Sequence, residues 1–342
     1  MTTAIVILNW NGEKYLQQFL PILTKFTSDT DVEIIVADNA STDSSLQVMK
    51  DYFPAIRTIV LDENYGFAGG YNKALEQIEA DYYVLLNSDV EVTDNWLSPL
   101  LNFMNENENV AACQPKIRSY YNRTSFDHAG ASGGFIDQYG FPFCRGRVFG
   151  VVEEDKGQYD DNIDVFWATG ACLVVRSKVF WQVGGLDSDF FAHMEEIDLC
   201  WRLKSRGYRV VCVPGSVVYH IGGGTLHVDS PYKIYLNFRN NLLLLYKNLP
   251  NDLLKRIMFW RRLFDYSAAF QFILTGKFKN AKSVFRARSD YKKMLPDFLE
   301  KRNENILYST NLNITEIYLD SIVLKYFLQN KKTYNSLKNR WF

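Results

Sequence analysis

The stretch Ala4-Ile5-Val6-Ile7-Leu8-Asn9-Trp10-Asn11-Gly12 decides the fold, because five apolar residues are followed at once by polar residues and a glycine. A continuous apolar run of this length is typical of a strand that is buried on both faces. The polar residues mark the point where the strand ends and a loop begins. Since ligands of α/β sheets bind at the carboxyl ends of the strands, we expect a binding site at this edge.

Apolar runs of the same kind alternate with helical patterns along the first part of the chain. The sequence predicts strands at 4–8, 32–37, 56–61 and 82–86. It predicts helices at 13–23, 44–52 and 71–79, the last of them after a turn at 66–70. This alternation predicts an α/β fold in which a mostly parallel central sheet is flanked by helices.

The later segments are less regular. Residues 113–165 predict loops and short antiparallel strands, and the segments after them predict strands at 166–175 and 208–213 and helices at 177–183 and 198–206. After about residue 230 the pattern changes to long helices. We therefore expect one domain over residues 1–230 and a helical C-terminal appendage over residues 231–342.

Composition narrows the class of protein. The 342 residues are 47% hydrophobic and carry a net charge of −1, which is ordinary for a globular protein and gives no support for nucleic-acid binding. The five cysteines form no CxxC pair, so a thiolate zinc site is not expected, and their odd number suits a reducing cytoplasm. With no signal-peptide pattern and no bilayer-length apolar run, we expect a cytoplasmic protein.

The C-terminal helices have an unusual composition. Residues 251–300 contain 11 Lys and Arg against 5 Asp and Glu, and aromatic residues lie among the basic ones. Such a segment can lie on an anionic membrane surface, here on the inner face of the membrane, or it can be an ordinary solvated helix face packed on the main domain. The sequence leaves these two interpretations open.

The strand ends carry the first candidate site residues. Asp38 directly follows the strand at 32–37, where its carboxylate can accept a hydrogen bond from a pyrimidine N–H or a ribose hydroxyl. It can equally begin a turn, with Ser41, Thr42 or Asp43 capping the next helix. The glycines at 66–70 would let backbone approach a nucleotide closely, although they form neither a P-loop nor a GxGxxG motif.

Asn87-Ser88-Asp89 ends the strand at 82–86. A single carboxylate at such a place can hold Mg²⁺ or Mn²⁺, with water and substrate phosphates completing the coordination. The alternative is a plain surface turn.

Two further groups lie later in the chain. Glu195, Glu196 and Asp198 place three carboxylates within four positions, which can raise a carboxyl pKa and suits a general base, but acids are also favoured where a helix begins. His220 precedes Gly222-Gly223-Gly224-Thr225 and is a candidate ligand for a metal or a diphosphate.

Taken in order, these motifs resemble the family 2 glycosyltransferases, the large inverting group with a GT-A fold. The resemblance covers roughly residues 3–228 and includes Asn-Tyr-Gly-Phe-Ala-Gly-Gly-Tyr-Asn at 64–72, Gly-Gly-Leu-Asp at 184–187 and Glu-Glu-Ile-Asp-Leu-Cys-Trp-Arg at 195–202. The most similar subgroup contains bacterial rhamnosyltransferase-like enzymes of surface polysaccharide synthesis. Two positions depart from the family pattern, since Asn87 replaces the first acid of the metal motif and Glu196 stands where Asp is commoner.

The resemblance implies a role for each candidate residue. Asp89 and His220 would hold the metal, and Glu196 would be the catalytic base, with Glu195 as the alternative. Asp198 and Arg202 would position the acceptor or phosphate. The remaining residues would form the nucleotide-sugar site: Asn9, Asn11, Asp38, Asn39, Gly66, Gly70, Asn72, Asn87 and Ser88.

The function expected from this resemblance is inverting transfer of a sugar from a dTDP-, UDP- or GDP-sugar to a hydroxyl of a glycan or lipid-linked acceptor. Two alternatives remain open on the residues alone. One is a sugar-phosphate nucleotidylyltransferase, although residues 9–12 lack the Arg that such an enzyme places after its first strand. The other is a non-catalytic protein that binds nucleotide sugars or glycans.

Overall fold

The computed structural model describes residues 1–27, 29–222 and 230–337. The strands are β1 (Thr3–Asn9), β2 (Val32–Asp38), β3 (Arg57–Val60), β4 (Tyr82–Asn87), β5 (Val90–Val92), β6 (Val110–Ser119), β7 (Gly134–Asp137), β8 (Pro142–Cys144), β9 (Arg147–Val148), β10 (Val151–Val152), β11 (Ile163–Asp164), β12 (Cys172–Arg176), β13 (Arg209–His220) and β14 (Ile317–Tyr318). The helices are α1 (Glu13–Lys25), α2 (Ser45–Tyr52), α3 (Gly66–Leu75), α4 (Ser98–Glu106), α5 (Ser177–Gln182), α6 (Glu195–Ser205), α7 (Pro231–Asn248), α8 (Asn251–Leu274), α9 (Phe278–Tyr308) and α10 (Ile322–Gln329), with short 3-10 turns at Ser188–Phe190 and Tyr334–Ser336.

The larger sheet is centred on β1, which pairs in parallel with β2 on one side and β4 on the other. Within the described residues its strand order is β11-β13-β6-β12-β4-β1-β2-β3, and β5 pairs with β13. Only β12, β5 and β11 run antiparallel to their neighbours. Asn9 lies opposite Asp38, and Leu8 lies opposite Asn87, so three of the predicted site positions reach one edge of the sheet.

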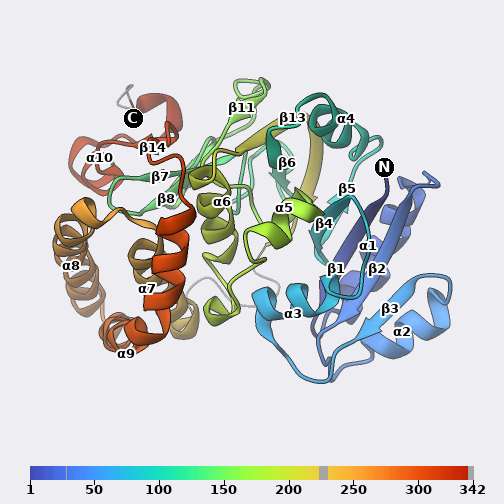
Figure 1. The fold of residues 1–342 in the computed structure, drawn as a ribbon, viewed down its shortest axis with the longest axis horizontal. Helices are drawn as coiled ribbons and strands as arrows, with labels where there is room; N and C mark the ends of the chain where they lie inside the picture. The colour runs from blue at the N-terminus through green and yellow to red at the C-terminus, as the bar shows by residue number, and fades with distance from the viewer. Residues whose placement is uncertain (28, 223–229, 338–342) are drawn as a thin grey trace.

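Helices cover both faces of this sheet (Figure 1). Alternate residues of β1 point to opposite sides, as the two-residue period of a strand requires. Ala4 and Val6 belong to the core shared with α3, α5 and α6, and Ile5 and Ile7 belong to the core shared with α1, α2 and α4. The α/β architecture predicted from the sequence is therefore confirmed.

Three predicted boundaries are wrong by five residues or more. Helix α3 begins at Gly66 rather than after Gly70, so the glycines form its first turns and not a preceding loop. Strand β12 begins only at Cys172, because 166–171 is largely irregular. Strand β13 continues through Pro214 to His220, with an irregular register between Val213 and Val217 that accommodates the proline.

The segment 113–165 contains short antiparallel strands, as predicted, and they form a second sheet. Its order is β10-β9-β8-β7-β14, and β14 comes from the C-terminal region. Ile317 and Tyr318 pair in parallel with Ile136 and Asp137. Helices α7, α8 and α9 lie on the opposite side of the molecule from β1, β2 and β3 (Figure 1). The division at residue 230 stays a prediction, although β14 ties the later region to the second sheet.

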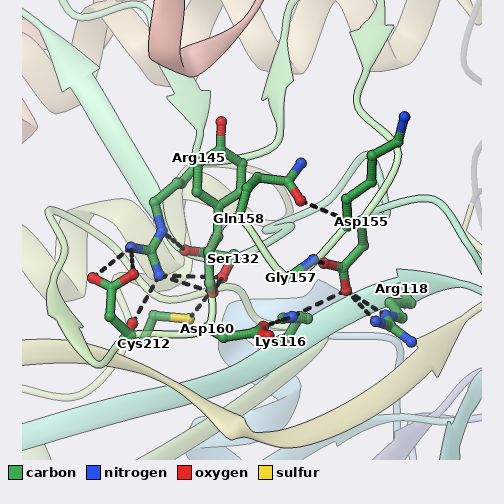
Figure 2. Close-up of polar contacts among 12 residues, drawn as sticks. Lys116, Arg118, Ser132, Arg145, Asp155, Gly157, Gln158, Asp160 and Cys212 are labelled. Carbon is green, nitrogen blue, oxygen red and sulfur yellow. Dashed lines mark hydrogen bonds and ion pairs between the residues drawn. The ribbon is translucent and has the colours of Figure 1, made fainter.

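The loop at 153–161 is held against β6 by buried charges (Figure 2). The Asp155 carboxylate has no exposed side-chain surface and accepts hydrogen bonds from Lys116 Nζ at 3.0 Å and Arg118 Nε at 2.7 Å. Burial would raise the pKa of Asp155, but the hydrogen bonds from Lys116 and Arg118 hold it below its ordinary value. Lys116 also pairs with Asp160. The loop is therefore held against β6, the strand that contains Arg118.

A second cation closes the other end of this loop. Arg145 Nη1 lies 3.1 Å from Asp161 Oδ1, and Arg145 Nη2 donates to the Tyr159 carbonyl at 3.2 Å. Arg145 Nε also donates to the Ser132 carbonyl at 3.2 Å. Arg145 is itself buried. Because a buried guanidinium needs this many acceptors, the loop and the second sheet form one unit.

All five cysteines are buried and free. Among the helices in the described part of the chain, none combines the length and the apolar character that crossing a membrane requires.

Replacing Lys116 by Met should lower the free energy of unfolding by about 3 kcal/mol, because it leaves Asp155 and Asp160 short of a buried counter-charge. Urea denaturation measures this loss. The matched control is Lys156→Met, whose partner Glu154 is exposed, as Lys156 itself is, and which should cost less than about 1 kcal/mol. Equal losses in the two variants would contradict the structural role assigned to Lys116.

Candidate active site

The Asp38 carboxylate is buried where β2 ends beside β1. It accepts hydrogen bonds from the Asn9 side-chain amide at 3.0 Å and from the backbone N–H of Ser41 at 2.9 Å. The Asn9 Oδ1 atom is buried without a hydrogen-bond partner among the described residues. A buried amide oxygen with an unused acceptor position is a site that a ligand N–H or O–H can satisfy. The structure thus brings Asp38 and Asn9 together at the predicted edge.

Asn11 and Asn39 hold the loops around this pair. Asn11 Oδ1 accepts from the backbone N–H of Thr42 at 2.7 Å, which fixes the loop after β2. Asn39 is buried and donates to the Gly66 carbonyl at 3.0 Å, and its Oδ1 accepts from the Tyr65 N–H at 3.1 Å. Both side chains form hydrogen bonds with backbone groups of neighbouring loops, so their observed contacts hold these loops in place.

Gly66, the first residue of α3, contacts Phe191 in the segment that precedes Glu195 and Glu196. Its φ is +70°, and a Cβ there would lie 2.5 Å from Cδ2 of Phe191, so no other residue fits without a shift. The Phe67 N–H donates to the Phe191 carbonyl at 2.6 Å. At Gly70 a Cβ would lie 2.9 Å from Leu8, so this glycine permits close packing of α3 on β1.

Asn72 extends the same connection. Its side chain pairs with the backbone of Leu186, donating to the carbonyl at 2.7 Å and accepting from the N–H at 3.0 Å. Residues 184–188 are therefore fixed against α3.

Asp89 and His220 meet in a buried pair, and their implied role as metal ligands stays a prediction. His220 Nε2 lies 3.2 Å from Asp89 Oδ1, and His220 Nδ1 lies 3.1 Å from Asp127 Oδ2. Burial lowers the pKa of His220, but the two carboxylates outweigh it and raise this pKa to about 10. Burial raises the pKa of Asp89, and the charge on His220 brings it below its ordinary value. Gly223, Gly224 and Thr225, which follow His220 in the sequence, lie outside the described residues.

This pair has the chemistry of a partial metal site. One carboxylate and one imidazole are suitable ligands for Mg²⁺- or Mn²⁺-type ions, and Asp127 orients the imidazole from behind. In the described part of the chain, no group of three or more His, Cys, Asp or Glu side chains is arranged to hold a metal ion alone. The residues therefore fit an ion whose other ligands come from phosphate and water. Asn87 and Ser88 lie just before Asp89, half-buried at the same edge.

Glu195 and Glu196 begin α6, and each has one carboxylate oxygen that is short of a hydrogen bond. The Oε2 atom of each is buried without a hydrogen-bond partner among the described residues. Burial, and next the charge of Glu196, raise the pKa of Glu195 well above its ordinary value. Burial raises the pKa of Glu196 to about 7. Glu195 is the more enclosed of the two, whereas Glu196 is partly exposed.

The backbone before this pair is strained. Phe191, His193 and Met194 have φ values of 64°, 71° and 76°. Residues other than glycine rarely adopt this backbone region. Each such residue costs about 1–3 kcal/mol and persists only where surrounding contacts impose it. Strain of this kind directly before unpartnered carboxylates is typical of a functional site.

Asn240 of α7 provides those contacts. Its side chain is fully buried. Its amide nitrogen lies within hydrogen-bond distance of three carbonyl oxygens, at 2.8 Å from that of Phe190, 2.9 Å from that of Ala192 and 2.7 Å from that of His193. The neighbouring Arg239 donates to the Phe190 carbonyl at 3.1 Å. Helix α7 therefore holds the strained segment in place from outside the predicted catalytic domain.

Asp198 is occupied by cations and an amide. Its carboxylate accepts from Arg202 Nε at 2.8 Å, from Lys247 Nζ at 2.9 Å and from Asn248 Nδ2 at 2.9 Å. Lys247 also donates to Asp187 at 2.7 Å. Burial raises the pKa of Asp198, but Arg202 and Lys247 outweigh it and lower this pKa. Asp198 joins α6 to α7, and Arg202 joins α6 to the carbonyls of Val183 and Gly185. The predicted role of Asp198 and Arg202 toward the acceptor or phosphate stays a prediction.

Three residues with important contacts were missed in the sequence. Asp127 has no local pattern to distinguish it, because its partner His220 lies 93 positions away. Lys247 is likewise an ordinary lysine near a helix end. Asn240 carried a weak signal, since Asn240 and Asn241 interrupt an otherwise apolar stretch that continues through Leu242 to Leu245.

A family model described as "Glycosyl transferase family 2" matches residues 4–184, more than half of the chain. The chain belongs to glycosyl transferase family 2.

Curated relatives agree with this assignment. The chain is 27% identical over 231 residues to N-acetylglucosaminyl-diphospho-decaprenol L-rhamnosyltransferase of Mycobacterium tuberculosis, covering 63% of this chain and 75% of that protein. It is 24% identical to rhamnosyltransferase WbbL of Escherichia coli, covering 63% of this chain and 82% of that protein.

Solved structures share the fold. GalNAc-T7, crystallised with UDP, GalNAc and Mn²⁺, superposes with a TM-score of 0.59 at 15% identity, over 90% of this chain and 57% of that one. The TarS fragment 1–349 of S. aureus in complex with UDP-GlcNAc gives a TM-score of 0.57 at 17% identity, over 90% of this chain and 89% of that one. The GT-A fold expected from the resemblance is confirmed.

Replacing Asn240 by Asp should reduce the turnover number roughly 10- to 100-fold. The substitution keeps the shape of the side chain but places a carboxylate, which cannot donate a hydrogen bond, next to three carbonyl oxygens. The KM for the sugar donor should change little, because the residues around Asp38 are untouched. Steady-state kinetics measure both. The control is Asn305→Asp, because Asn305 is also a buried amide but donates to Asn248. This variant should be less stable than the wild type but should keep its turnover number. Equal losses of turnover would show that Asn240 has no specific positioning role.

Proposed function

We propose that this protein is an inverting glycosyltransferase that moves a sugar from a nucleoside-diphosphate sugar to a hydroxyl of a glycan or lipid-linked acceptor in cell-surface polysaccharide synthesis. One observation carries the proposal. Glu195 and Glu196 begin α6, each with one buried carboxylate oxygen that has no hydrogen-bond partner among the described residues, and the segment before them is bonded to the start of α3. The rhamnosyltransferase names of the curated relatives support a deoxyhexosyl donor.

Glu196 is the general base in this proposal. A base must be deprotonated at working pH and must be reachable by the acceptor. A pKa of about 7 and partial exposure allow both for Glu196, whereas Glu195 is enclosed. Glu196 removes the proton of the acceptor hydroxyl, whose oxygen attacks the anomeric carbon as the bond to the diphosphate breaks. One displacement inverts the configuration and needs one base, unlike the paired carboxylates of glycosidases.

At the other end of the donor, Asp89 and His220 would hold Mg²⁺ or Mn²⁺ together with the diphosphate. Such an ion would supply stabilisation for the negative charge that develops on the leaving diphosphate. Asp127 keeps the His220 ring turned toward Asp89 through its bond to Nδ1. Asp38 and the free Asn9 Oδ1 would accept hydrogen bonds from the base or ribose.

Incubation with dTDP-, UDP- and GDP-sugars and a divalent ion tests the proposal by release of nucleoside diphosphate. Glu196→Gln should reduce this release at least about 100-fold, since it removes the base and keeps the shape. Glu195→Gln is the matched control and should lose far less. Near wild-type release by the Glu196→Gln enzyme would remove Glu196 from the mechanism, and nucleotide binding without any release by the wild type would favour a non-catalytic binder.

The pKa of Glu196 also predicts a pH dependence. Because the base is active only when it is deprotonated, kcat/KM should rise with pH through about 7 and then level off. Glu196→Asp places a carboxyl farther from the acceptor and should lower the plateau. A rate that is flat between pH 5 and 8 would contradict a base with this pKa.

A further inference from the structure

The outer face of α8 carries an apolar stripe that nothing in the described chain covers. Exposed apolar side chains recur at the three- and four-residue spacing of one helix face, at Phe259, Leu263, Tyr266, Phe270 and Ile273. Phe259 and Phe270 are 56% and 59% exposed. The stripe extends over about 21 Å of α8, at the edge of the molecule away from β1–β3 (Figure 1).

The inner face of α8 combines apolar contacts, such as that of buried Ile257 with the core, with a buried ion-pair network. Asp265 is fully buried and binds Arg261 at 2.9 Å and Arg288 of α9 at 2.5 Å. The Arg261 guanidinium also lies 3.9 Å from the centre of the Phe141 ring. Because turning α8 would break these buried ion pairs, its rotation is fixed with the aromatic stripe outward.

The stripe continues onto α9 and is bordered by cations. Tyr266 contacts Phe285 of α9, with ring centres 5.9 Å apart. From residue 253 to residue 289 the one carboxylate in the sequence is the buried Asp265. Exposed basic residues lie beside the stripe on both helices: Lys255, Arg256, Arg262, Lys279, Lys282 and Arg286.

We propose that this face of α8 and the start of α9, here called the α8 face, docks on the surface of a lipid bilayer that contains anionic lipids. Aromatic and aliphatic side chains in a plane, flanked by cations, match the boundary between acyl chains and negatively charged headgroups. A second copy of the chain is a poorer match, because a symmetric contact would bring two cationic faces together. The proposal does not depend on the reaction assigned above.

Flotation of the full chain with vesicles tests this inference. The vesicles consist of phosphatidylcholine alone or of phosphatidylcholine with about 30% phosphatidylglycerol. We expect binding to the anionic vesicles at least about tenfold above binding to the neutral ones, and a loss of binding in high salt.

Two double variants examine the two parts of the α8 face. Phe259→Ser with Phe270→Ser removes apolar contacts, and Arg256→Glu with Arg262→Glu reverses charges. Each should weaken binding to anionic vesicles at least about tenfold. All these side chains are exposed, so thermal melts should match the wild type.

Matched controls lie on the helices at the other side of the molecule. Leu46→Ser with Tyr52→Ser and Lys14→Glu with Lys50→Glu change the same kinds of exposed residue on α1 and α2. These controls should bind as the wild type does. Absence of wild-type binding to anionic vesicles, or equal losses in the controls, would overturn the inference. A dimer in sedimentation that only the α8 variants dissociate would instead assign the α8 face to a second copy.

Discussion

The parallel register of β1 with β2 and β4 is the constraint on which the rest of the structure depends. It places Asn9 beside Asp38 and the end of β4 at the same edge, so the loops that follow all begin there. The antiparallel pairing of β5 with β13 then sets His220 opposite Val90, next to Asp89. Backbone hydrogen bonds thus bring both ends of the proposed nucleotide-sugar site to one edge of the sheet.

Buried polar contacts from α7 complete the site. Asn240 holds the strained carbonyls before Glu195, and Lys247 neutralises Asp187 and Asp198. A buried carboxylate without such a partner takes up a proton or keeps a raised pKa, as Glu195 and Glu196 do. The contrast between Asp198 and Glu196, two positions apart on one helix, shows how the same chemical group becomes a structural ion pair or a candidate base.

The sequence predicted the central strands well, because continuous apolar runs bounded by polar residues have few other interpretations. It predicted the start of α3 poorly, because glycine disfavours helix and yet Gly66 and Gly70 are required by close contacts with Phe191 and Leu8. It stopped β13 at Pro214, where a local irregularity keeps the strand going. Among the site residues, the pairing of Asp89 with His220 came from the resemblance and not from spacing.

What the sequence by itself determined is the alternation of strands and helices and the presence of polar residues at the strand ends. Those features depend on periodicities of a few residues. The tertiary structure alone decided the partner of each carboxylate and which face of α8 is outward. Ionisation and burial depend on distances in space, and the decisive contacts join positions such as Asp127 with His220 and Asp198 with Lys247, which lie 93 and 49 residues apart in the chain.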